Sequence, residues 1–241
     1  MRHSEGIEMA ERNDTTRQRV FQRIWDIPTR LFHWLLAGAI VGAYWTGEFG
    51  GIDKTWHMRF GYAILALIGF RIMWGLFGSP PSRFASFLAG PRAVLSYMGG
   101  LGERRARPYA THNPLGALSV VALLAAALVQ AATGLFADDA ILTQGPLARL
   151  APGWVSSLAT NIHAWNIWVL IALVALHLAA IAFYHLYKRE NLVGAMITGR
   201  KALPPGMGME KPASVWLAGL ALLIAAGAVY LLVERLPGWV G

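Results

Sequence analysis

The sequence contains no cysteine and has few charged residues. Of its 241 residues, 14% are Asp, Glu, Lys or Arg, whereas 56% are hydrophobic. The absence of cysteine excludes disulfides, thiolate metal ligands and a haem attached through thioethers. A soluble chain usually carries about a quarter charged residues. We therefore expect an integral membrane protein that is surrounded by membrane lipid.

Five apolar segments each come close to the ~20 residues that cross ~30 Å of hydrocarbon. They are residues 31–47, 57–77, 115–136, 162–187 and 213–233. Pro28 suits the first turn of a helix that begins before the first segment, with Asp26 as its cap. No segment contains Asp or Glu, and only the second contains Arg, at positions 59 and 71.

The basic residues gather in alternate connections between these segments. Lys and Arg number six in residues 1–30, five in 78–114 and five in 188–212, against three in the other connections and the C-terminus. Basic connections stay in the cytoplasm, so we expect a multi-pass membrane protein with a cytoplasmic N-terminus and a C-terminus on the outer side. This distribution explains the net charge of +8 without nucleic acid as a partner.

Four histidines lie in or at the ends of three segments, where a polar ring needs a partner. His163 and His177 are 14 residues apart, which is ~21 Å along a helix and nearly one face. His33 lies near the cytoplasmic start of the first span, at the same depth in the membrane as His177. His57 lies at the outer start of the second span, at the same depth in the membrane as His163. These depths predict two bis-histidine sites, one in each leaflet.

Two imidazoles per site suit haem b as the cofactor. Haem iron takes axial protein ligands, and helix bundles build such sites from facing helices, whereas zinc takes three or four protein ligands. Gly61 follows His57 by one helical turn, where a porphyrin could approach the backbone. Arg59 and Arg71 are candidate partners of haem propionates. For both arginines the alternative is snorkelling to lipid headgroups.

Two further histidines allow more than one interpretation. His112 precedes Asn113 and Pro114, which are helix start signals. A loop or capping role is expected for His112, with the lining of an inner quinone pocket as the alternative. His185 is expected to be an interfacial residue because it is followed by "LYKRE".

Several motifs resemble the bacterial cytochrome b561 family, particularly the branch of nickel-iron hydrogenase b-type cytochrome subunits. In order they are "WDIPTRLFHW", "HMRFGY", "FRIMWGLFGSPPSRFASF", "HNPLGALSVVALLAAALVQAATGLF" and "ENLVGAMITGRK", within roughly residues 20–203. The resemblance implies a four-helix core that binds two b haems through His33, His57, His163 and His177. It also implies electron exchange between quinone and a partner redox protein in a respiratory chain of a bacterial inner membrane, with the C-terminus in the periplasm. The fifth segment, which lacks histidine, departs from this pattern.

The expected fold class is an all-α integral membrane protein. A four-helix transmembrane bundle would bind two haems, and a fifth transmembrane helix would follow at the C-terminus. Residues 1–25 would form a cytoplasmic tail, 26–203 the diheme core, and 204–241 a linker with the fifth helix.

The predicted function is electron transfer across the bilayer between the quinone pool and a periplasmic partner. Three variants stay open. The chain could anchor a dehydrogenase or hydrogenase and reduce quinone, oxidise quinol for a c-type cytochrome, or act alone, for example on superoxide. The alternative from another class is a haem-free transporter or anchor, which the lack of Asp and Glu in the predicted spans disfavours. The sequence is compatible with a homo-oligomer and leaves the quinone site and the direction of electron flow open.

Overall fold

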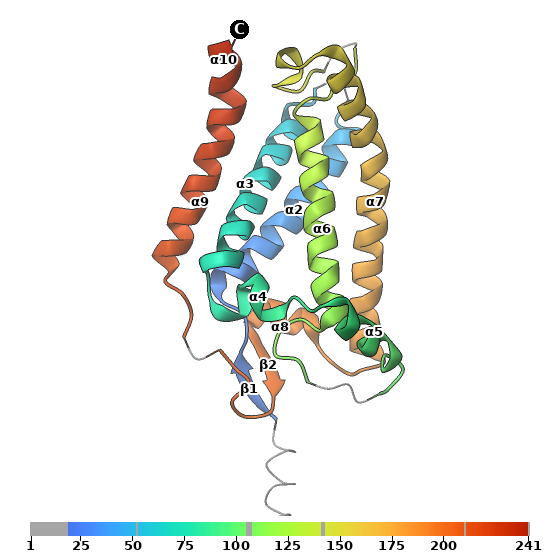
Figure 1. Cartoon of the computed structure of the whole chain (residues 1–241), viewed down its shortest axis with the longest axis vertical. Helices are drawn as coiled ribbons and strands as arrows, with labels where there is room; N and C mark the ends of the chain where they lie inside the picture. Colours follow the sequence, from blue (N-terminus) through green and yellow to red (C-terminus); the bar gives the residue numbers. More distant parts are fainter. Residues whose placement is uncertain (1–18, 52, 105–107, 141–142, 210, 241) are drawn as a thin grey trace, which may run out of the picture.

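Four long helices form a bundle, and a further helical segment packs against one of them (Figure 1). The computed structural model describes residues 19–51, 53–104, 108–140, 143–209 and 211–240. The bundle consists of α2 (Ile27–Phe49), α3 (Thr55–Phe77), α6 (Pro114–Gly134) and α7 (Gly153–Leu186). Along α3 run α9 (Val215–Tyr230), a π-helical stretch (Leu231–Arg235) and α10 (Leu236–Val240).

Two of the bundle helices begin where the sequence predicts. Asp26 caps α2 by accepting a hydrogen bond from the Thr29 backbone N–H at 2.8 Å, with Pro28 in the first turn. Asn113 caps α6 in the same way, accepting from Gly116 N–H at 2.8 Å. The cap of α6 is therefore Asn113, whereas His112 lies just outside the helix.

The expectation of an all-α protein needs one correction. β1 (Val20–Arg23) and β2 (Arg200–Leu203) form an antiparallel pair in which Phe21 lies opposite Ala202. Both strands are short, and each lies in a stretch where the sequence analysis expected no strand. Their pairing ties the segment before α2 to the segment after α7. We call this end of the bundle the strand end and the opposite end the loop end.

Short elements close the strand end beneath the bundle (Figure 1). They are a 3₁₀ turn (Pro80–Ser82), α4 (Phe84–Phe87), α5 (Pro91–Gly99) and α8 (Leu192–Thr198). The Ser82 hydroxyl lies 2.7 Å from the Thr29 hydroxyl in a buried contact between the 3₁₀ turn and α2. The Ser79 hydroxyl accepts a hydrogen bond from Ala213 N–H at 2.9 Å, which fixes the approach to α9.

Two helix boundaries at the loop end differ from the expected ones. α2 continues to Phe49, so Glu48 belongs to this helix although the predicted apolar segment ended at residue 47. α7 begins at Gly153, well before the predicted apolar segment that starts at residue 162, and a 3₁₀ turn (Ala148–Leu150) precedes it. An acidic side chain is therefore part of a bundle helix.

Four helices among the described residues are long and apolar enough to cross a membrane. They are Thr55–Phe77, Pro114–Gly134, Gly153–Leu186 and Val215–Gly238. α2 is not among them, although it is 23 residues long and packs along α3. The five-span topology therefore stays a prediction.

Candidate functional site

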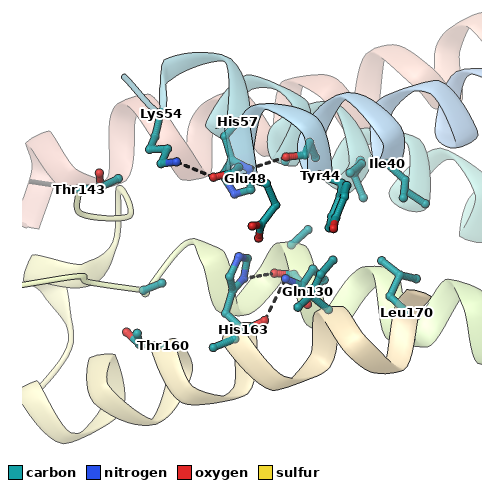
Figure 2. A pocket seen from close by; sticks show the side chains of 18 of the residues that line it. Ile40, Tyr44, Glu48, Lys54, His57, Gln130, Thr143, Thr160, His163 and Leu170 are labelled. Atoms are coloured by element: carbon teal, nitrogen blue, oxygen red, sulfur yellow. Dashed lines mark hydrogen bonds between the residues drawn. The ribbon is translucent and has the colours of Figure 1, made fainter. Parts of the chain in front are cut away.

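His57 and His163 face one another at the loop end, from α3 and α7 (Figure 2). Their ring centroids are 6.1 Å apart and the ring planes are inclined by 82°. His57 Nδ1 donates to the carbonyl of Ala43 at 2.8 Å, and His163 Nδ1 donates to the carbonyl of Gln130 at 2.9 Å. A carbonyl oxygen can only accept, so each Nδ1 carries the proton. Each Nε2 therefore keeps a free lone pair, as a metal ligand requires.

A cavity of about 460 Å³ lies between these two rings. Its wall includes Gly61, where an added Cβ would meet no atom within 4 Å, so a flat group has room against the backbone there. An added Cβ at Gly47 would lie 2.9 Å from His57 Nδ1, and one at Gly134 would lie 3.0 Å from His163 Cε1. The two glycines on α2 and α6 therefore let the rings take these positions.

Two polar side chains that the sequence analysis did not single out support His163. Gln130 Nε2 donates to the backbone carbonyl of His163 at 3.0 Å, and Asn166 Nδ2 donates to Gln130 Oε1 at 2.8 Å. These bonds join α6 to α7 beside the cavity. A signal was present in the sequence, because Gln130 interrupts an apolar run of small and aliphatic residues.

Glu48 and Lys54 also line this cavity. Figure 2 shows the Glu48 side chain, which comes from the last turn of α2, extending toward the space between the two histidines. Lys54 Nζ donates to the Gly47 carbonyl at 2.5 Å. The sequence analysis missed both residues because they lie outside the apolar segments predicted at 31–47 and 57–77.

His33 and His177 form a second pair nearer the strand end, from α2 and α7. Their ring centroids are 6.4 Å apart and the planes are inclined by 48°. His33 Nδ1 is buried, and the described residues offer it no hydrogen-bond partner. The structure therefore places side by side the same two pairs of histidines that the sequence analysis paired by their depth in the membrane.

His112 lies near the second pair, and the charges of Arg71, His177 and His33 all act on it. Arg71 is only 3% exposed, its guanidinium carbon lies 4.6 Å from the centroid of the Phe84 ring, and its Nη1 has no hydrogen-bond partner among the described residues. His112 packs between Trp25 and Phe87, with centroid distances of 5.0 and 4.6 Å. Burial, with the charge of Arg71 as the next cause, lowers the pKa of His112 to about 3, so the ring is neutral.

Arg59 is separated from both histidine pairs. Its side chain is exposed, its guanidinium carbon lies 4.9 Å from the centroid of Trp56, and it is not among the residues that line the cavity. This placement favours an interfacial role over a propionate contact. Of the two arginines of α3, Arg71 is buried and Arg59 is exposed. The sequence alone could not predict this difference.

The chain belongs to the prokaryotic cytochrome b561 family, whose model matches residues 24–199. It is thus a multi-pass membrane protein of the cytochrome b class, which carries haem b and transfers electrons. A probable Ni/Fe-hydrogenase B-type cytochrome subunit of Azotobacter chroococcum mcd 1 is 26% identical, covering 80% of this chain and 93% of the relative. One from Rhizobium leguminosarum bv. viciae is 23% identical, covering 77% and 90%. No solved structure matches the chain at comparable significance.

Both histidine pairs fit haem b. A metal–imidazole nitrogen bond of ~2 Å on each side of an iron separates two ring centroids by about 6 Å, and the observed separations are 6.1 and 6.4 Å. The cavity, the free Nε2 atoms and the open space at Gly61 agree with a flat cofactor at the first pair. No cluster of three or more His, Cys, Asp or Glu that could hold a metal ion occurs in the described part of the chain. When bound, haem supplies one-electron redox chemistry.

Proposed function

We propose that the chain holds two b haems, one between His57 and His163 and the other between His33 and His177, and moves electrons across the membrane. The observation that carries this proposal is the recurrence of one ring separation, near 6 Å, in two separate histidine pairs. The 14-residue spacing on α7 puts ~21 Å between its two histidines. Each pair therefore serves one half of the bilayer.

The protein would exchange electrons with a periplasmic redox protein at the loop end and with quinone. The excess of Lys and Arg in the connections at the strand end supports a cytoplasmic position for that end. The names of the relatives, which are hydrogenase cytochrome subunits, support a dehydrogenase or hydrogenase as the partner. The family's electron-transfer role supports a place in the bacterial inner membrane.

Chain residues would set the properties of each site. The carbonyls of Ala43 and Gln130 hold the His57 and His163 rings with Nε2 unprotonated. The buried guanidinium of Arg71 offers donors that only an acceptor from outside the described residues can satisfy, and a haem propionate is such an acceptor. The bundle that holds the second pair has an apolar core, in which Phe32, Phe70 and Leu170 are buried.

The test is a count of haem per chain in protein purified in mild detergent, with a dithionite-reduced minus oxidised spectrum. We expect a b-type spectrum and two haems per chain. His177→Ala and His163→Ala should each retain one haem, and His185→Ala, which changes an exposed histidine on the same helix, should retain two. A His177→Ala protein with two haems would contradict the ligand assignment, and folded wild-type protein without haem would favour a transporter or anchor.

A further inference from the structure

One short helix at the strand end exposes apolar side chains. On α5, Leu95 and Met98 are 68% and 52% exposed, whereas Val94 and Tyr97 are half-buried. The helical period places these four side chains on one continuous half of the helix, and the exposed Ser96 lies on the other half. A helix with this division, whose apolar half is only partly covered by protein, is typical of a segment that lies in the plane of a membrane surface.

Hydrogen bonds fix α5 at the level where two long apolar helices end. The Tyr97 hydroxyl is hydrogen-bonded to the Tyr184 hydroxyl, which also accepts from Asn113 Nδ2 at 2.8 Å. Tyr184 belongs to the last turn of α7, and Asn113 caps the start of α6. Figure 1 shows α5 beside these two helix ends. Because α6 and α7 are long and apolar enough to cross a membrane, their ends place α5 at the level of the membrane boundary.

The segment that follows α5 is attached to the same end of α7. The Tyr187 hydroxyl donates to the Gly102 carbonyl at 2.7 Å. Lys188 Nζ donates to the carbonyl of the next residue, Glu103. The depth of α5 in the membrane therefore does not depend on a single hydrogen bond.

The charge of this connection indicates which lipids suit it. Residues 78–114 contain five arginines but only one acidic residue, Glu103. Arg92 is exposed on the polar half of α5, and Arg104 is exposed with its guanidinium carbon 5.9 Å from the centroid of the Tyr187 ring. Basic side chains at this level attract anionic headgroups, and each one adds to the attraction.

We propose that α5 is an interfacial helix that rests on the anionic phospholipid surface of the leaflet at the strand end. Leu95 and Met98 enter the boundary between headgroups and acyl chains, and Arg92 lies among the lipid phosphates. The apolar face is short, so anionic headgroups supplement the contribution of its burial. This inference goes beyond the proposed function and does not depend on haem.

The experiment uses the full-length protein, whose lack of cysteine allows a fluorophore at one chosen position. Leu95→Cys, Met98→Cys and the matched control Ser96→Cys are labelled and reconstituted into vesicles of phosphatidylcholine and phosphatidylglycerol. Part of the lipid carries bromine on its acyl chains. We expect brominated lipid to quench the labels at positions 95 and 98 strongly, and iodide in the water to quench mainly the label at position 96.

A second measurement tests the charge of the lipid. Brominated phosphatidylglycerol should quench the Leu95→Cys label more than brominated phosphatidylcholine at the same fraction. Arg92→Gln should reduce this preference by up to about fivefold, whereas Arg92→Lys should keep it. Added salt should also reduce it, because the charges are exposed. Arg149→Gln removes an exposed charge at the loop end and serves as the control that leaves the preference unchanged.

Each outcome decides the proposal. Equal quenching of all three labels by brominated lipid would overturn it. Labels at positions 95 and 98 that iodide reaches and brominated lipid does not would also overturn it and favour a soluble protein on this face. Strong quenching without a preference for phosphatidylglycerol would contradict the assignment to anionic lipid.

Haem per chain, measured on the same samples, separates this inference from the proposed function. No variant in these measurements changes a histidine. Two haems per chain with labels open to iodide would contradict the inference alone. Fewer than two haems per chain with labels quenched by brominated lipid would contradict the proposed function alone.

Discussion

At the scale of the residue, the position of one proton decides whether a histidine can bind a metal. Two backbone carbonyls at 2.8 and 2.9 Å place that proton on Nδ1 of His57 and His163. The sequence predicted the pairing of these histidines because depth along a helix follows from residue number. It could not predict their tautomers, because the acceptor carbonyls belong to α2 and α6, which are distant in sequence.

Gln130 provides a test at this scale. Gln130→Leu keeps the backbone carbonyl that accepts from His163, but it removes the two side-chain bonds that join α6 to α7. Loss of partners for buried polar groups costs about 1–3 kcal/mol. We therefore expect a lower thermal unfolding temperature and selective loss of the His57–His163 haem, measured as haem per chain. Leu128→Ala, at an exposed position of the same helix, is the control and should retain both haems.

At the scale of the element, apolar length was sufficient to predict where the helices lie, whereas their ends depended on local chemistry. Asp26 and Asn113 cap their helices through side-chain bonds of 2.8 Å, and both were recognisable as helix starts. Gly47 ends the predicted apolar segment, yet α2 continues past it through Glu48 to Phe49. The β1–β2 pair was missed because strands of four residues gain their stability from a partner about 180 residues away.

The contact between α3 and α9 gives the prediction for this scale. Gly69 lies against Ala225, where an added Cβ would stand 3.3 Å from the Ala225 Cβ. Gly69→Leu would therefore force the helices apart, at a cost of about 1–3 kcal/mol for overpacking. We expect a lower thermal unfolding temperature in detergent with two haems retained, because α9 contributes no histidine.

The control for this contact is Gly219→Leu. Gly219 is exposed on α9, and an added Cβ there would meet no atom within 4 Å. Its unfolding temperature should match the wild type. Equal effects of the two substitutions would show that the α3–α9 contact does not stabilise the protein.

At the scale of the whole molecule, the open question is whether α2 crosses the membrane with the other four helices. Arg30 and Glu48 lie near its two ends, which reduces its apolar character relative to the others. Yet α2 runs from the strand end to the loop end alongside α3 (Figure 1). The pairing of β1 with β2 also places the segment before α2 at the strand end. This arrangement supports the prediction that α2 crosses the membrane.

The cysteine-free sequence suits a direct measurement of this topology. Single substitutions Asp53→Cys and Gln144→Cys, both at exposed loop-end positions, should react in intact cells with a maleimide that does not cross the inner membrane. Arg19→Cys and Arg92→Cys, exposed at the strand end, should react only after permeabilisation. If α2 did not cross, Arg19→Cys would react together with Asp53→Cys, because both positions would lie on the same side. Protection of Arg19→Cys alongside Arg92→Cys, with reaction of Asp53→Cys, would establish that α2 crosses the membrane and put the His33–His177 pair in the cytoplasmic half of the bilayer.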